Sequence, residues 1–266
     1  MAEIMKNGRL YDRNELNIPE GFGLIYEVIR IMDRTPLFFH EHYQRFADTA
    51  GSRGITGAPS KAEFREMLDR FLQAFAKDDY NIKIIFAEDT RDLYIYENPS
   101  SYPEEILYLE GIHTELMVYQ RENPTAKITN PDLTTQANAL REKTGAYEVL
   151  LVDPSGFVTE GSRSNVFFIK DGSVHTPPLK SVLPGVTRQL IIKTCQAMKV
   201  NVIETDINSE DLHTYEGAFI SGTSPKILPV RNIGELELAS AALLLLKDIM
   251  AGFDRTIQND LETYRK

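Results

Sequence analysis

The chain has 266 residues, of which 42% are hydrophobic and 26% charged, as is ordinary for a soluble globular protein of one large or two medium domains. Its 29 Lys and Arg against 39 Asp and Glu give a formal charge of −10, which argues against nucleic acid as the main partner. No apolar run approaches the roughly 18 residues of a membrane span. The lone Cys195 cannot form an intrachain disulfide, so we expect a soluble, cytoplasmic protein.

The first half of the chain predicts an α+β arrangement. Residues 23–32 are rich in apolar and β-branched side chains and indicate a buried strand, and residues 40–50 indicate a short helix. Residues 60–77 predict an amphipathic helix, which Ser60 can cap. Further strands are expected at 80–87, 92–97 and 113–119. We therefore expect a smaller N-terminal α+β domain over residues 1–118.

A segment with little periodicity follows this half. Residues 119–133, YQRENPTAKITNPDL, contain two prolines and favour an interdomain connection, which we place at 119–126. Residues 127–266 then predict a larger C-terminal domain that mixes strands and helices. Its helices are expected at 134–144, 187–198 and 238–252, with the tail able to extend the last, and its strands at 147–153, 164–169, 173–176, 201–205, 217–221 and 226–230. The predicted fold class is α/β (α+β) with two domains.

Three polar spots lie where predicted elements begin or end, and each has two interpretations. A Pro-Gly turn precedes a helix whose first N–H groups, at Val186 and Thr187, can bind a phosphate, or Thr187 can simply cap the helix. The Ser-Gly-Thr-Ser run at 221–224 can form an anion-binding nest or an ordinary polar loop. Arg45 can pair with a phosphate in bidentate fashion or lie on the surface. The residues alone leave these alternatives open.

One acid stands out between two apolar strands. In LLVDPSGFVTEGSRSNVFFIKDG, residues 150–172, Glu160 is followed by the small and polar residues 161–165. A carboxylate buried at such a place needs a partner, because an unpaired buried charge is costly.

Together these segments resemble one family. VTEGSRSNVFFI, TPPLKSVLPGVTRQLI and FISGTSPKILPVRNI are similar to signature segments of the class IV aminotransferases, the fold-type-IV pyridoxal-phosphate enzymes. LIYEV and EHYQR carry a thinner likeness before residue 120. The family includes branched-chain aminotransferases, D-amino-acid aminotransferases and aminodeoxychorismate lyases. The resemblance implies a two-domain fold, pyridoxal 5'-phosphate as cofactor and a homodimer.

The resemblance also implies roles for particular residues. Glu160 is implied to pair with the ring nitrogen of the cofactor, a pairing that favours a protonated pyridine. Lys127, 160 − 127 = 33 residues before that acid, is implied to bind the cofactor aldehyde and to move the α-proton of the substrate. The other implied cofactor contacts are Ser164 and Asn165 at the ring, and Arg45, Val186, Thr187 and Thr223 at the phosphate. Gly222 is implied to bind the cofactor as well. Tyr26 and Ser224 are implied to meet the substrate.

The implied reaction is ping-pong transfer of an amino group from an amino acid to a 2-oxo acid, of the branched-chain aminotransferase type. Arg91 has no histidine two positions away, which disfavours the D-amino-acid activity. KITNPDL has Pro131 and Asp132 where branched-chain enzymes carry a tyrosine, so elimination of pyruvate from aminodeoxychorismate is the alternative.

Two classes without catalysis are also considered. These are a binding module that keeps only the fold and a structural or regulatory protein without a cofactor, and the presence of both Lys127 and Glu160 argues against them. The histidines are scattered, and His40 and His42 would face apart on a helix, so no metal site is expected.

Overall fold

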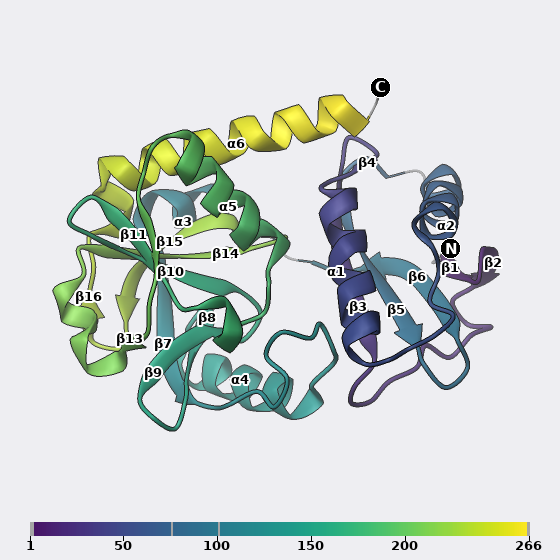
Figure 1. Cartoon of the computed structure of the whole chain (residues 1–266), viewed down its shortest axis with the longest axis horizontal. Helices are drawn as coiled ribbons and strands as arrows, with labels where there is room; N and C mark the ends of the chain where they lie inside the picture. The colour runs from purple at the N-terminus through teal and green to yellow at the C-terminus, as the bar shows by residue number, and fades with distance from the viewer. Residues whose placement is uncertain (1–2, 76, 101, 265–266) are drawn as a thin grey trace. The chain divides into compact units, whose positions relative to one another are not determined.

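The computed structural model describes residues 3–75, 77–100 and 102–264 (Figure 1). Its backbone contacts divide the chain into two compact units, each with its own sheet. Unit 1 comprises Met1–Ser101, Ala126–Pro131 and Asn259–Lys266, and unit 2 comprises Tyr102–Thr125 and Asp132–Gln258. Within the described ranges, no helix has both the length and the apolar character needed to cross a membrane.

The sheet of unit 1 is antiparallel, with the strand order β2-β1-β6-β5-β3-β4. Its two longest strands, β3 (Ile25–Met32) and β5 (Tyr80–Ala87), pair from Ile25 opposite Phe86 to Ile31 opposite Tyr80. Because side chains alternate along a strand, every second residue of β3 is buried on one face. The other strands are β1 (Glu3–Lys6), β2 (Arg9–Asp12), β4 (Thr35–Pro36) and β6 (Asp92–Asn98).

Two helices contribute to the core on this face of β3, α1 (Phe39–Ser52) and α2 (Lys61–Ala74). Phe46 of α1 lies with its ring centroid 5.2 Å from that of Phe64 of α2. At the start of α2, Ser60 and Glu63 exchange the two hydrogen bonds of a capping box, which confirms the predicted helix start. The helix ends at Ala74, and Ala76 of the predicted range lies outside the described residues.

The sheet of unit 2 has the order β12-β11-β10-β14-β15-β7-β8-β9-β13, with β16 paired to β15. Strand β7 (Ile112–Val118) runs parallel to both of its neighbours, and β11 runs parallel to β12. The other strands are β8 (Glu148–Val152), β9 (Phe157–Gly161), β10 (Asn165–Lys170), β11 (Ser173–Thr176), β12 (Val202–Glu204), β13 (Ile207–Asn208), β14 (Gly217–Gly222), β15 (Lys226–Ile233) and β16 (Leu236–Glu237).

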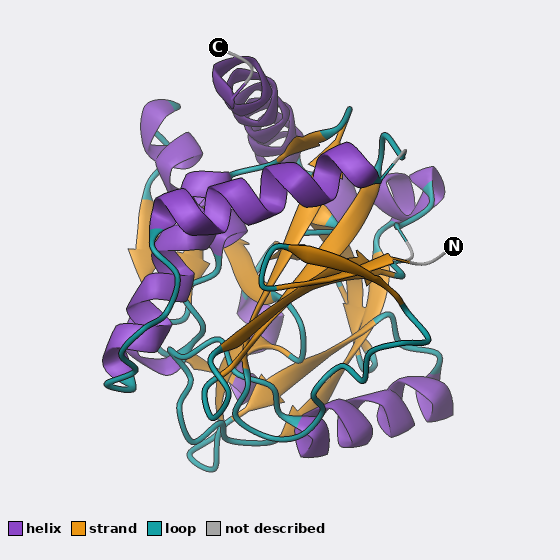
Figure 2. Ribbon diagram, turned by 90° about the vertical axis from the view of Figure 1, so that its right-hand side faces the viewer, coloured by secondary structure: helices purple, strands orange, loops and turns teal. Residues whose placement is uncertain are grey.

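Figure 2 colours the helices and strands separately, and in chain order two helices of unit 2 each connect two of its strands. Helix α5 (Val186–Ala197) contacts β14, whose Phe219 stacks on Phe167 of β10 with centroids 4.8 Å apart. Cys195 of α5 is buried in the core, and burial raises the pKa of its thiol to about 11. The other helices are α3 (Glu105–Glu110), α4 (Pro131–Thr144) and α6 (Leu244–Tyr264), with 3-10 turns at Leu179–Ser181, Ser209–Thr214 and Ser240–Ala242.

The mixed α/β architecture with two sheets confirms the predicted fold class. The compact units differ from the predicted domain limits of 1–118 and 127–266, because β7 pairs in the sheet of unit 2 and residues 126–131 belong to unit 1. Periodicity along β7 reveals a strand but not its partner β15, which follows much later in the chain. The last helix begins at Leu244 instead of 238, after a 3-10 turn, and continues to Tyr264.

Candidate functional site

The backbone around Lys127 is fixed by β3 and α1 within unit 1. The carbonyl of Lys127 accepts a hydrogen bond from the N–H of Tyr26 at 3.1 Å, and Ile128 bridges to Ile25. The N–H of Lys127 donates to the hydroxyl of Thr49 on α1 at 3.4 Å. These contacts hold Lys127 next to the start of β3, although its segment lies far from β3 in the sequence.

The amine of Lys127 lies against Tyr26. Its Nζ donates to the Tyr26 hydroxyl at 3.3 Å and lies 4.4 Å from the centre of the ring. A second amine, that of Lys83 on β5, lies 5.1 Å from the same ring. Burial lowers the pKa of Lys83, and the charge of Lys127 acts in the same direction. Two lysines therefore share one aromatic ring, and only Lys127 was predicted from the sequence.

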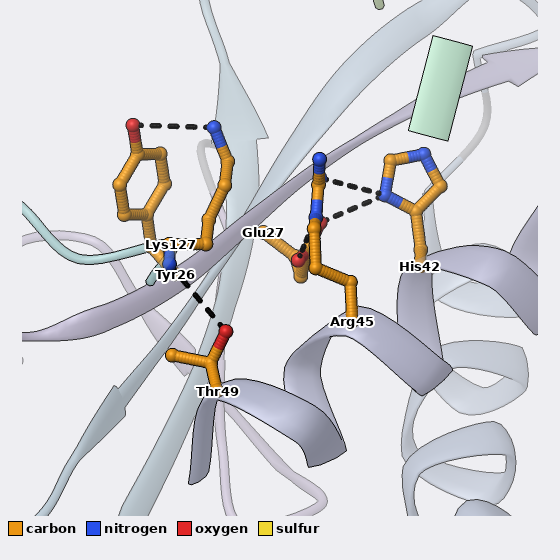
Figure 3. Close-up of polar contacts among 6 residues, drawn as sticks. All are labelled: Tyr26, Glu27, His42, Arg45, Thr49 and Lys127. Atoms are coloured by element: carbon orange, nitrogen blue, oxygen red, sulfur yellow. Dashed lines mark hydrogen bonds and ion pairs between the residues drawn. The ribbon is translucent and has the colours of Figure 1, made fainter. Parts of the chain in front are cut away.

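Arg45 is buried on α1 and is engaged by an acid. Its Nε donates to Glu27 Oε1 at 2.8 Å and its Nη2 to Glu27 Oε2 at 2.6 Å, a bidentate pair (Figure 3). His42 Nδ1 lies 2.8 Å from Glu27 Oε2. Burial alone would raise the pKa of Glu27, but Arg45 and His42 lower it to about 2. Burial also lowers the pKa of His42.

This cluster adds detail to the predicted role of Arg45. The charge of Arg45 is offset by Glu27, which directly follows Tyr26 in the sequence. Glu27 was not predicted as a site residue. Figure 3 shows the amine of Lys127 and the guanidinium of Arg45 extending to the same side of the ribbon. Contact between Arg45 and a cofactor phosphate stays a prediction.

Glu160 is buried near the end of β9 in unit 2 and both of its oxygens accept hydrogen bonds. Arg121 Nη1 donates to Oε1 at 2.8 Å, and the N–H of Leu183 donates to Oε2 at 3.0 Å. Arg121 lies in the segment that the sequence marked only as a connection. Its position shortly after β7 ends was the one available signal, because polar residues at strand ends commonly line sites.

Leu183 begins the turn that leads into α5. Its carbonyl accepts a hydrogen bond from Asn165 Nδ2 at 3.0 Å, so Glu160 and Asn165 hold the same residue. The N-cap of α5 is Gly185, which makes no side-chain capping bond. Capping by Thr187, the alternative interpretation, is therefore not observed. A Cβ on Gly185 would lie 2.0 Å from Asn165 Oδ1, so the close approach requires glycine.

The polar run at 221–224 contains the end of β14. Ser221 lies opposite Asn165 in the strand register, and its hydroxyl is buried without a hydrogen-bond partner among the described residues. Because directly opposed side chains lie close together, Ser221 and Asn165 share one face of the sheet. Gly222 ends β14, and the turn through Thr223 and Ser224 leads to β15 at Lys226. Asn165 therefore lies between two parts of the site. It binds Leu183 before α5 and lies opposite Ser221 in the sheet.

Ser164 lies beside a buried acid, Glu148. Its hydroxyl donates to Glu148 Oε2 at 2.9 Å, and the Ser162 hydroxyl donates to Oε1 of the same acid at 2.6 Å. Arg163 is exposed and donates to the carbonyl of Tyr147. A contact between Ser164 and a cofactor stays a prediction, with its hydroxyl proton directed toward Glu148.

Comparison with known proteins agrees with these observations. Residues 24–233 match the family model described as "Amino-transferase class IV". A "Probable branched-chain-amino-acid aminotransferase" of Thermotoga maritima is 30% identical over 80% of this chain and 78% of its own length. The D-alanine aminotransferase of Bacillus licheniformis is 24% identical over 90% of this chain and 91% of its own.

A solved structure shows the same fold. The branched-chain aminotransferase of Thermoproteus uzoniensis, crystallised with norvaline, superposes with a TM-score of 0.86 at 23% identity, over 99% of this chain and 97% of that one. The family match covers most of the sequence, and the segments that bear the resemblance lie within it. The chain therefore belongs to the class IV aminotransferases.

Proposed function

We propose that this protein is a pyridoxal-phosphate-dependent aminotransferase that moves the amino group of branched-chain-type amino acids to a 2-oxo acid. One feature of unit 2 carries the proposal. Leu183, whose N–H binds Glu160, lies only two residues before Gly185, where α5 begins without a side-chain cap. In pyridoxal phosphate one ring carbon separates the ring nitrogen from the carbon that bears the phosphate arm. Such a ligand needs an acid and an anion site this close together.

The residues of unit 2 fit this cofactor. The first N–H groups of an α-helix lack partners within the helix and carry partial positive charge, which suits a phosphate. The buried Ser221 hydroxyl adds hydrogen-bonding capacity next to Asn165. Thr223 follows in the same run, so Val186, Thr187, Gly222 and Thr223 are the phosphate contacts that we propose for this unit.

The proposed residues have different roles in the reaction. When bound, pyridoxal phosphate supplies an electron sink for the bond broken at the substrate α-carbon. Glu160 holds a proton at the ring nitrogen, and Arg121 and Leu183 orient its carboxylate. In unit 1 the amine of Lys127 takes the α-proton and returns it, and Tyr26 orients that amine. Arg45 binds the phosphate, with Glu27 fixing its guanidinium.

The branched-chain assignment rests on the relatives' names and on Arg91 having no histidine two positions away, which disfavours the D-amino-acid activity. One departure weighs against it and keeps the lyase as the alternative. Pro131 and Asp132 occupy the positions after Lys127 where the sequence predicted a departure from branched-chain enzymes, and both are exposed at the start of α4. Tyr26 and Ser224 are the substrate contacts that we propose. A homodimer and a cytoplasmic setting, the latter inferred from the single cysteine, belong to the same proposal.

The visible absorption spectrum tests the function. Purified protein given pyridoxal phosphate should develop a visible band that collapses with L-leucine and persists with D-alanine. Lys127→Ala should abolish the band, and Lys143→Ala, which alters an exposed lysine of α4, should keep it. A band that responds to aminodeoxychorismate and to no amino acid would replace the transferase with the lyase. Absence of any band would contradict the cofactor.

A further inference from the structure

Glu148 is a buried acid with no place in the mechanism above. It begins β8 and is only 1% exposed. Its Oε1 accepts from the Ser162 hydroxyl at 2.6 Å and from the N–H of Val149 at 2.8 Å, and its Oε2 accepts from the Ser164 hydroxyl at 2.9 Å. Burying a carboxylate is costly unless hydrogen bonds compensate it, so a cluster this complete requires a reason.

Two arginines surround the same acid at longer range. Arg141 Nη1 lies 3.8 Å from Oε1 and Arg163 Nε lies 3.8 Å from Oε2. Arg163 is more than half exposed, so water screens its charge. The direct partners of Glu148 are therefore dipoles, and two of the three come from a single turn.

That turn, residues 161–164, connects the two side chains that hold Leu183. Glu160 lies immediately before it and Asn165 immediately after it. Within the turn, the N–H of Gly161 donates to the carbonyl of Ser164 at 2.8 Å. The backbone N–H of Ser162 donates to the carbonyl of Val149 at 2.8 Å. A Cβ on Gly161 would lie 2.0 Å from Ser164 Oγ and 3.2 Å from Glu148 Cδ. The turn is thus packed tightly against the carboxylate.

We propose that Glu148 is a positioning residue: its carboxylate fixes the 161–164 turn and so sets the directions of Glu160 and Asn165 toward the Leu183 turn. This inference rests on the proposed function, because the direction of Glu160 matters only if a ligand nitrogen must meet it. A hydroxyl pair on one rigid acceptor constrains both ends of the turn. An apolar residue at 148 would fill the space and remove the acceptor that both hydroxyls share. Ser162 would keep only the hydrogen bond that its hydroxyl accepts from Arg141 Nη1 at 3.3 Å.

The test compares two cofactors on the full chain. Apo protein is titrated with pyridoxal phosphate and with its deaza analogue, in which carbon replaces the ring nitrogen, and both dissociation constants are measured. Wild-type protein should prefer the natural cofactor, because only its nitrogen can bond to Glu160. Glu148→Ala should reduce this preference about tenfold, the loss expected for one charge-assisted hydrogen bond, while binding of the analogue changes little. Glu148→Gln should recover part of the preference, since it keeps one acceptor.

Smaller changes keep the test valid if Glu148→Ala fails to fold. Ser164→Ala removes one hydroxyl of the cluster and should lower the preference in the same direction. Ser155→Ala, in the exposed turn at the other end of the β8–β9 hairpin, is the matched control and should leave it unchanged. In a Glu160→Gln background, Glu148→Ala should have no further effect on the preference.

Three results would overturn the inference. If the Glu148 and Ser164 variants weaken both cofactors equally, Glu148 only stabilises the fold, and the proposed function stands. If their effects persist in the Glu160→Gln background, Glu148 does not act through Glu160. If wild-type protein binds both cofactors equally, or neither, the assignment of Glu160 fails and the inference fails with it.

Discussion

Two buried acids, one in each unit, are compensated in opposite ways. Glu27 in unit 1 is matched by charge, since Arg45 binds it in bidentate fashion and His42 adds a third contact. Glu148 in unit 2 is matched mainly by dipoles, the hydroxyls of Ser162 and Ser164 and a backbone N–H. Breaking the first arrangement leaves the buried Arg45 without its counter-charge. Breaking the second leaves two hydroxyls, a backbone N–H and two arginines that lie 3.8 Å away and are partly exposed. The first cluster should therefore respond strongly to charge and pH, and the second to shape.

The largest difference should come from neutralising each acid. Glu27→Gln leaves Arg45 buried without its counter-charge and should lower the free energy of unfolding by about 3–5 kcal/mol. Glu148→Gln keeps an acceptor for the two hydroxyls and should cost less, about 1–3 kcal/mol. Urea denaturation monitored by circular dichroism gives both values. The control is Glu88→Gln, which breaks an exposed pair with Arg53 and should cost less than about 1 kcal/mol. Equal losses for Glu27 and Glu148 would remove the contrast.

The pH dependence of stability should follow the charged cluster. The pKa of Glu27 falls from 4.5 to about 2 on folding, so its contribution is present above pH 4.5 and is lost as the pH falls toward 2. That contribution is about 3 kcal/mol. The pKa of His42 is also lowered, so the unfolded chain takes up a proton first and stability falls as the pH drops below 6.5.

Thermal denaturation across this range measures both effects. His42→Gln should remove the loss that begins below pH 6.5 and should leave the loss at lower pH, which belongs to Glu27. A stability that rises on acidification from pH 6.5 to 5 would contradict the neutral, buried state of His42.

A smaller difference should come from adding a methyl group at a glycine in each unit, because one glycine is closely packed and the other is not. Gly185→Ala in unit 2 places a Cβ 2.0 Å from Asn165 Oδ1 and should cost about 1–3 kcal/mol, with weaker binding of pyridoxal phosphate. Gly51→Ala, in α1 of unit 1, meets nothing within 4 Å and should stabilise the protein by about 0.5–1 kcal/mol. Denaturant midpoints measure the changes in stability, and titration with pyridoxal phosphate measures the change in cofactor binding. If Gly185→Ala were as harmless as Gly51→Ala, the turn before α5 would not be held closely.

The smallest effect should come from a single hydroxyl of the dipolar cluster. Ser162→Ala removes the 2.6 Å hydrogen bond to Glu148 and should lower the unfolding free energy by about 1–2 kcal/mol. Ser155→Ala, in an exposed turn, should change it by less than about 0.5 kcal/mol. Both are measured by urea denaturation, and a loss at Ser162 no greater than that at Ser155 would show that the cluster is loosely held.

Local signals in the sequence predicted many of the helices and strands. The Ser60–Glu63 capping box marked the start of α2, and the β-branched run marked β3. A sequence period fixes what an element is but not what it pairs with, so the parallel pairing that places β7 in unit 2 was not predicted.

The same distinction between local sequence and long-range contacts applies to the candidate site. Lys127, Glu160 and the start of α5 could be predicted as site residues because their residue types are unusual in their local setting and match one family. The partners Arg121 of Glu160 and Glu27 of Arg45 were missed, as was Glu148, because these contacts join segments that only the folded backbone brings together. Ser164 is an example, because its hydroxyl donates to Glu148, which is distant in the sequence and begins β8.

The most direct test of the central claim is to locate the bound cofactor. Protein incubated with pyridoxal phosphate is reduced with borohydride, digested and sequenced by mass spectrometry, which finds the lysine that carries the cofactor permanently. We expect the adduct on Lys127 alone, with Lys83, the other amine beside Tyr26, unmodified. An adduct on Lys83 or any other lysine, or none at all, would contradict it.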